Sequence, residues 1–368
     1  MPRWPRVAAL SPLTLALLAC GGGAAAPDGG LPDGSDGGTL DATADASPPD
    51  ATTDAGPPPP MDAGPSLDDA AAPLGPPYPI VLAHGFFGFE DFAGADFLTY
   101  FFEVREDLAR RGETLVFTPA VDPFGDSTRR GEQLLAEVEA ILDETGYGKV
   151  NLIGHSQGGL DARYVAHERP EWIASVTTLG TPHRGTPMLD VLLGVVEDDR
   201  LAALVDDLVR LLGAPLYDEV GRETSLFEAL RQLSREGAAA FNERYPDVAG
   251  IPYYSIAGRS DRRFAFSQCA PDGAAPAFLE RWEGYLDPID PLLAISEAIV
   301  DGGFGSPYPN DGLVRIEDAR WGTFLGCIPA DHLDQVGHLL GDSPGFGNGF
   351  DHKEFFAGLV AWLRSQGL

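Results

Sequence analysis

The chain has few basic side chains for its length. Its 368 residues include 25 lysines and arginines against 56 acidic residues, and the formal net charge is −31. Only Lys149 and Lys353 are lysines. Proteins bind nucleic acids and anionic lipid surfaces chiefly through clustered positive charge. This acidic balance argues against a nucleic-acid partner and against electrostatic docking on anionic lipid.

The sequence also lacks long hydrophobic runs and internal repeats. The apolar stretch at 7–19 is too short to span a bilayer, and it follows the basic residues Arg3 and Arg6. It ends in Leu-Leu-Ala-Cys-Gly (17–21), which resembles the lipobox of bacterial lipoproteins. We therefore expect residues 1–20 to be an export signal, with a lipid anchor on Cys20 at the outer membrane or cell surface. An ordinary secretory signal is the alternative.

Cysteine is scarce, with three in the whole chain. If Cys20 carries the lipid, Cys269 and Cys327 are left as a pair in an oxidising compartment. We expect the two to form a disulfide.

Residues 21–77 contain no basic residue and few large apolar ones, and consist mainly of Gly, Ala, Pro, Asp, Ser and Thr. Such a segment buries too little apolar surface to offset its ordering entropy, so we expect a disordered, proline-stiffened linker. The remainder, 78–368, is long enough for one sizeable α/β domain.

The most informative motif is Gly-His-Ser-Gln-Gly at 154–158. An apolar run at 150–153 predicts a buried strand before it, and 160–171 predicts a helix after it. A serine in Gly-x-Ser-x-Gly between a strand and a helix is typical of a nucleophile elbow, in which a tight turn exposes the hydroxyl above the sheet. Gly154 and Gly158 let the two backbones approach closely. The pattern predicts Ser156 as a catalytic nucleophile.

The rest of the folded part alternates between predicted strands and helices. Strands are expected at 78–83, 114–118, 173–179 and 253–257, and helices at 96–111, 130–145 and 352–366. This order predicts a largely parallel sheet with helices on both faces. The alternation breaks at about 187–240, where leucines recur at helical spacing. That segment is either a helical insertion that packs on the core or a lid over the site.

A serine nucleophile needs a base, and in this fold the order along the chain is Ser, acid, His. The histidines after Ser156 are His167, His183, His332, His338 and His352. His332 lies in a loop-like segment, and Asp311 lies before it on an Asp-Gly turn. The pair Asp311 and His332 therefore fits the required order.

Five motifs occur together and in the order found in one family. They are Tyr-Pro-Ile-Val-Leu-Ala-His-Gly-Phe-Phe-Gly-Phe (78–89), Gly-Glu-Gln-Leu-Leu (131–135), Val-Asn-Leu-Ile-Gly-His-Ser-Gln-Gly-Gly (150–159), Asn-Asp-Gly-Leu-Val (310–314) and Asp-His-Leu-Asp-Gln-Val (331–336). In these the chain resembles the bacterial family I triacylglycerol lipases, over nearly all of its folded part. The resemblance implies a secreted, calcium-dependent enzyme with the α/β-hydrolase fold.

The resemblance also implies a role for individual residues. Ser156 would be the nucleophile, His332 the general base and then acid, and Asp311 its orienting partner. The oxyanion hole would be formed by the backbone N–H groups of Phe86 and Gln157. His84 and His155 would shape loops.

The family holds a structural Ca²⁺ near the catalytic histidine. The matching positions here are the carboxylates of Asp287 and Asp334 and, through backbone carbonyls, His338 and Asp342. Calcium is bound by such hard oxygen ligands. Cys269 and Cys327 do not fall where the best-known members place their cysteines, which leaves dependence on a folding chaperone open.

The sequence therefore predicts an exported serine ester hydrolase that acts on triacylglycerols. Two alternatives share the same machinery, a carboxylesterase for soluble esters and a depolymerase of polyhydroxyalkanoates. A non-catalytic binding lipoprotein is a third, although no element of the expected site is missing from the sequence.

Overall fold

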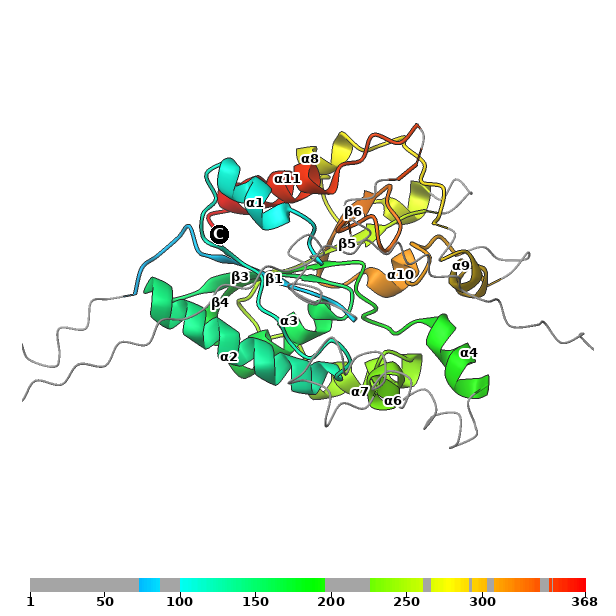
Figure 1. Ribbon diagram of the computed structural model, residues 1–368, viewed down its shortest axis with the longest axis horizontal. Coiled ribbons are helices and arrows are strands. Elements are labelled where there is room, and N and C mark those ends of the chain that lie inside the picture. The colour runs from blue at the N-terminus through cyan, green and yellow to red at the C-terminus, as the bar shows by residue number, and fades with distance from the viewer. Residues whose placement is uncertain are drawn as a thin grey trace, which may run out of the picture. The chain divides into compact units, whose positions relative to one another are not determined.

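A sheet of six parallel strands forms the centre of the described part of the chain (Figure 1). Along the sequence these are β1 (Ile80–Ala83), β2 (Val116–Phe117), β3 (Val150–His155), β4 (Ile173–Leu179), β5 (Tyr253–Gly258) and β6 (Thr323–Ile328). Their order across the sheet is β2-β1-β3-β4-β5-β6. Every residue of β1, β3 and β4 is buried, as expected for parallel strands that are covered on both faces.

The computed structural model describes residues 73–86, 100–195, 226–260, 266–290, 293–302, 308–337, 344–345 and 347–368. The expected signal 1–20 with Cys20, and residues 21–72 of the expected linker, lie outside these ranges. No helix within the described ranges has the length and apolar character needed to cross a bilayer.

Helices cover both faces of the sheet (Figure 1). In one layer α1 (Val104–Arg110), α8 (Ala277–Glu280) and α11 (His352–Ser365) share an apolar cluster with Ile80 and Leu82 of β1. In the other layer α2 (Ser127–Thr145), α3 (Gly158–Glu168) and α7 (Arg235–Arg244) pack with Val81 and Ala83. The alternation of side chains along one strand thus supplies both halves of the core.

Shorter elements complete the described chain. They are the 3₁₀ helices η1 (Pro170–Trp172) and η2 (Phe266–Cys269) and the helices α4 (Pro187–Val195), α6 (Leu226–Gln232), α9 (Ala294–Val300) and α10 (Ile316–Ala319).

Helix α2 shows how local sequence sets an element. The Asp126 side chain accepts hydrogen bonds from the N–H groups of Thr128 and Arg129 and caps the first turn. The helix ends at Gly146, whose left-handed φ of 74° suits glycine. Its apolar stripe, which includes Leu134 and Val138, is buried against the sheet.

The strand order places the functional loops. It reverses between β1 and β3, because β2 lies on one side of β1 and the later strands lie on the other. In open parallel sheets ligands bind beyond the carboxyl ends of the strands at such a reversal. The segments that begin at His84 and Ser156 leave β1 and β3 at this point.

The predicted α/β-hydrolase fold is confirmed. The prediction placed no regular element between 257 and 352, where the structure has η2, α8, α9, α10 and β6. The prediction omitted β6, in which Leu325 is an extra residue opposite the step from Ser255 to Ile256, so the strand lacks a regular alternation. Of the helix expected at 96–111, residues 96–99 lie outside the described ranges. Among the described residues it begins at Val104, because Glu103 before it has a left-handed φ of 54°.

The predicted disulfide between Cys269 and Cys327 is present, with Cα atoms 5.2 Å apart. It ties η2 to β6, an edge strand of the sheet. Of the insertion expected at 187–240, α4, α6 and α7 are described, and residues 196–225 lie outside the described ranges.

Candidate active site

Ser156 lies on the turn between β3 and α3, as expected for an elbow. Its φ is 54°, in the left-handed region that side chains other than glycine rarely adopt. Its backbone N–H donates to the Leu179 carbonyl at the end of β4, at 2.9 Å. The neighbouring strand therefore holds the strained turn in place.

The elbow requires glycine on both sides of Ser156. A Cβ on Gly154 would lie 2.4 Å from the Gly158 carbonyl oxygen, and one on Gly158 would lie 2.1 Å from the Ala83 carbonyl oxygen. A Cβ on Gly159 would lie 2.0 Å from the Thr181 hydroxyl. The glycines of the motif thus let α3 pack directly against β1 and β3.

The structure brings together the three residues predicted as a triad. His332 Nε2 lies 2.8 Å from the Ser156 hydroxyl oxygen, and His332 Nδ1 lies 2.8 Å from Asp311 Oδ2. A carboxylate without a proton can only accept, so Nδ1 carries the hydrogen and Nε2 is left to accept from Ser156. The imidazole is therefore in the tautomer that a general base requires.

Asp311 is almost fully buried, and both of its oxygens are hydrogen-bonded. Oδ1 accepts from the backbone N–H groups of Leu313 at 3.0 Å and Val314 at 2.7 Å. Oδ2 accepts from His332 and from Gln335 Nε2 at 2.7 Å. These donors compensate the buried carboxylate for the water that it has lost.

The two predicted oxyanion donors belong to adjoining segments. Phe86 follows β1, and Gln157 caps the N-terminus of α3 directly after Ser156. Between β1 and Phe86, a Cβ on Gly85 would lie 2.7 Å from the Ser156 Cβ. Glycine therefore allows this loop to approach the serine. Only the backbone of Gln157 is predicted to bind the oxyanion. Its side chain donates from Nε2 to the Gly125 carbonyl at 2.9 Å.

A buried ion pair supports the loop after β1. Arg130 of α2 is fully buried, and its Nε donates to Asp161 Oδ2 of α3 at 2.8 Å. The same guanidinium donates to the carbonyls of His84 and Asp122. Burial raises the pKa of Asp161 to about 6, and the charge of Arg130 opposes this shift. Through these hydrogen bonds Arg130 joins α2 and α3 and holds the His84 carbonyl beside the predicted oxyanion donors.

His84 and His155 have partners that fit loop-shaping roles. His84 Nε2 accepts from the Val121 N–H at 3.1 Å, while its Nδ1 lies 2.9 Å from the Gly85 carbonyl. His155 Nδ1 lies 2.6 Å from the Tyr100 hydroxyl, and its ring packs on His332 at a centroid distance of 4.7 Å.

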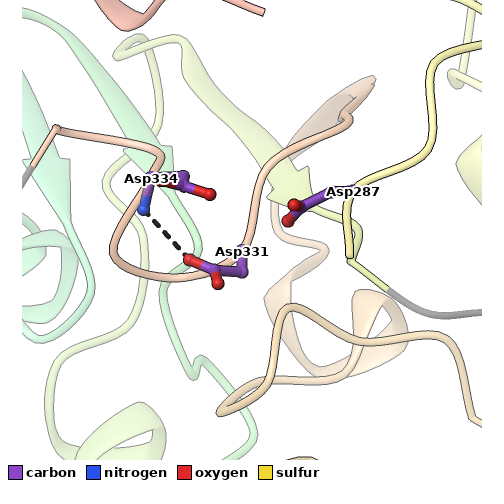
Figure 2. Close-up of side chains that lie close together, drawn as sticks. All are labelled: Asp287, Asp331 and Asp334. Carbon is purple, nitrogen blue, oxygen red and sulfur yellow. Dashed lines mark hydrogen bonds between the residues drawn. The ribbon is translucent and has the colours of Figure 1, made fainter. Parts of the chain in front are cut away.

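Next to the triad, three buried carboxylates converge from two segments (Figure 2). Asp331 and Asp334 flank His332 in the loop after β6, and Asp287 approaches from the segment before α9. One oxygen of each lies within 4.8 Å of the others. The structure thus brings together Asp287 and Asp334 of the predicted calcium site and adds Asp331. His338 and Asp342 lie outside the described residues.

Asp287 is 3% exposed, and neither of its oxygens has a hydrogen-bond partner among the described residues. Burial raises its pKa to about 8, the neighbouring Asp331 carboxylate adds to the shift, and the nearby Asp331 backbone N–H opposes it. Asp331 differs, because its Oδ1 accepts from the Leu333 and Asp334 N–H groups and its Oδ2 from the Asp290 N–H. A buried carboxylate without donors, facing two others, fits a cation that binds through oxygen.

Sequence reasoning missed three polar residues of this region, namely Arg130, Asp331 and Gln335. Arg130 lies in a helix that was predicted only as amphipathic. Asp331 and Gln335 lie in a quoted motif, directly beside His332 and Asp334. An acidic residue directly before His332 and three residues before Asp334 was the available signal for Asp331.

Comparison with known proteins agrees with this geometry. Residues 78–263 match the α/β hydrolase fold family. The triacylglycerol lipase of Vibrio cholerae is 36% identical over 274 residues, which cover 72% of this chain and 81% of that protein. The triacylglycerol lipase of Pseudomonas fragi is 32% identical over 284 residues, covering 71% of this chain and 88% of that protein.

Among solved structures, the crystal structure of Staphylococcus hyicus lipase aligns with a TM-score of 0.52 at 17% identity, covering 78% of this chain and 94% of that one. At this identity the likeness concerns the fold alone. The family match and the two sequence relatives carry the assignment: the chain belongs to the α/β hydrolase family and, within it, to the bacterial lipases that its motifs resemble.

Proposed function

We propose that this chain hydrolyses the acyl esters of triacylglycerols, with Ser156 as nucleophile, His332 as general base and acid, and Asp311 as the orienting carboxylate. The observation that carries the proposal is the continuous hydrogen-bonded chain from Asp311 through His332 to Ser156, with 2.8 Å at each step. It lies at the carboxyl end of a parallel sheet in a chain of the lipase family.

In the first half-reaction His332 Nε2 accepts the Ser156 proton as the serine oxygen attacks the ester carbonyl carbon. The carbonyl oxygen becomes an oxyanion, to which the backbone N–H groups of Phe86 and Gln157 donate. Each such donor is worth roughly 3 kcal/mol of transition-state stabilisation. His332 then passes its proton to the leaving glycerol oxygen, the C–O bond breaks, and an acyl-enzyme remains.

In the second half-reaction a water molecule replaces the glyceride. His332 Nε2 accepts one proton of the water as its oxygen attacks the acyl carbon, and the same two backbone donors stabilise the second oxyanion. His332 returns the proton to Ser156 as the fatty acid leaves. Asp311 stays ionised throughout and stabilises the imidazolium that forms in each half-reaction.

The substrate class is tested with emulsified triolein beside a soluble butyrate ester. We expect turnover of triolein, since both sequence relatives carry the name triacylglycerol lipase. Free fatty acid is measured by titration at constant pH, and the Ser156→Ala variant serves as the blank. Turnover of the butyrate ester alone would assign the chain to the carboxylesterases or polymer-ester hydrolases on the same machinery.

We also propose that the carboxylates of Asp287 and Asp334 hold a structural Ca²⁺. The support is the buried Asp287 carboxylate without donors, with Asp331 and Asp334 nearby. The ion would neutralise carboxylates that otherwise repel one another and would tie the segment of Asp287 to the loop of His332. It would take no direct part in bond breaking.

Finally, we propose that the chain is exported and anchored through lipid on Cys20. The disulfide between Cys269 and Cys327 supports export, because such bonds persist in oxidising compartments. We expect cells that express the full chain to incorporate labelled palmitate into it, and the Cys20→Ser variant to lose the label. A chain that is processed and released without label would indicate an ordinary secretory signal.

A further inference from the structure

Gln335 is a buried amide that contacts the predicted catalytic carboxylate. It lies one turn after His332, has no exposed surface, and its Nε2 is 2.7 Å from Asp311 Oδ2. Because an ionised carboxylate only accepts hydrogen bonds, the amide must present its nitrogen to Asp311. The chemistry of Asp311 therefore fixes the orientation of this amide.

Two glycines of the surrounding backbone make room for the Gln335 amide. A Cβ on Gly180, after β4, would lie 2.4 Å from Gln335 Oε1, and one on Gly258, at the end of β5, would lie 2.1 Å from Nε2. Gly180 has a left-handed φ of 56°. Two glycines at adjacent strand ends thus form a narrow slot that holds the amide.

The amide is buried in this slot although only its nitrogen forms a hydrogen bond. Gln335 Oε1 is buried and has no hydrogen-bond partner among the described residues. Burying an acceptor without a donor costs free energy, and an apolar side chain of the same length would avoid that cost. The benefit must therefore come from the Nε2 donor on Asp311.

We propose that Gln335 is a positioning residue, which fixes Asp311 Oδ2 in the line of His332 Nδ1. This inference rests on the proposed function. The backbone N–H groups of Leu313 and Val314 bond to Oδ1 only, and Oδ2 has two side-chain donors, His332 Nδ1 and Gln335 Nε2. Gln335 holds the second oxygen. Gln335 follows His332 in the same turn. This turn therefore positions both groups of the His332–Asp311 hydrogen bond, His332 directly and the Asp311 carboxylate through Gln335.

The test replaces Gln335 by methionine, which keeps the length and removes the donor. On a soluble butyrate ester at saturating Ca²⁺ we expect kcat to fall about tenfold, because a misaligned base loses transition-state stabilisation. KM should stay within about twofold, since Gln335 does not reach the substrate. The low-field proton resonance of His332 Nδ1–H should move or broaden, which reports the bond to Asp311 directly.

Val336→Ala is the matched control, because Val336 is fully buried in the same turn and contributes packing without a side-chain donor. We expect it to lower Tm and to leave kcat and the His332 resonance unchanged. If Gln335→Met does not fold, Gln335→Asn withdraws the same donor by one methylene. An unchanged kcat and resonance in a folded Gln335 variant would overturn the proposal.

This failure is distinguishable from failure of the proposed function. If hydrolysis persists in Ser156→Ala, the triad assignment itself is wrong, whatever Gln335 does. If hydrolysis depends on Ser156 and the Gln335 variants behave like the wild type, only the positioning role is lost.

Discussion

Replacing Ser156 by alanine is expected to lower kcat for ester hydrolysis by about 10⁵-fold or more, because the acyl-enzyme can no longer form. The remaining rate over water would come from the oxyanion donors and from substrate binding. The measurement is the initial rate on a soluble butyrate ester, with the fraction of folded protein checked by circular dichroism. Retention of most of the activity would refute the assignment of the nucleophile.

The same position gives a matched pair of variants that separates strain from chemistry. Ser156 and an alanine in its place both have a Cβ at a φ of 54°, a conformation that costs roughly 1–2 kcal/mol for a residue other than glycine. We expect Ser156→Gly to be as inactive as Ser156→Ala and to melt about 2–8 °C higher. An equal or lower Tm for the glycine variant would mean that the elbow stores no such strain.

A histidine control completes this comparison. His332→Ala should be inactive like Ser156→Ala, because the serine then lacks its base. His167, at the end of α3, bonds to the Pro246 carbonyl on the surface, so His167→Ala should retain wild-type kcat. If His167→Ala is inactive and His332→Ala remains active, His332 is not the general base.

The sequence predicted the three residues that the structure brings together as a candidate triad, because their signals are short patterns along the chain. Gly154 is required by a contact with Gly158, four residues later, whereas Gly158 is required by the Ala83 carbonyl of β1. The Gly-x-Ser-x-Gly pattern is nevertheless short enough to be recognised along the chain. Asp311 and His332 follow from chain order and from the family motifs. Each of these signals can be recognised without knowledge of which strands are neighbours.

The supporting residues could not be found in that way. The contacts of Arg130 with His84 and Asp161 join α2, the loop after β1 and α3, and they depend on how these helices pack. The slot around Gln335 depends on Gly180 and Gly258, which are adjacent only because β4 pairs with β5. The strand β6 was missed for a related reason, since its bulge at Leu325 is defined by its partner β5.

Removal of Ca²⁺ should destabilise the wild type strongly and should have no such effect on an Asp287→Asn variant. A ligand present at about 1,000 times its Kd stabilises the folded state by about 4 kcal/mol, which corresponds to roughly 8–16 °C in Tm. We expect this difference between wild-type protein in excess Ca²⁺ and in chelator, measured by calorimetry. Asp287→Asn should melt at one temperature under both conditions.

The order of thermal stability of the wild type and Asp287→Asn should also reverse when the metal is removed. At about pH 9, above the raised pKa of Asp287, the wild type in chelator buries an ionised carboxylate beside Asp331 and Asp334, whereas the asparagine carries no charge. Asp287→Asn should therefore be at least as stable as the wild type in chelator and less stable in Ca²⁺. The control Asp143→Asn removes one charge from an exposed position on α2 and should keep the full response. A wild type that is insensitive to chelator would exclude the metal site.

Activity should also depend on Ca²⁺, because two of the carboxylates lie in the same loop as His332. Asp331 and Asp334 flank His332, and the Asp331 side chain accepts from the Asp290 N–H in the segment that carries Asp287. Above pH 8, where Asp287 is ionised, repulsion among the carboxylates in chelator would separate these segments and move His332 relative to Ser156. We therefore expect kcat of the wild type to fall in chelator at temperatures below its Tm, with KM nearly constant, and to recover on addition of Ca²⁺. A fall in kcat that occurs only where the protein unfolds would mean that the metal stabilises the fold without positioning His332.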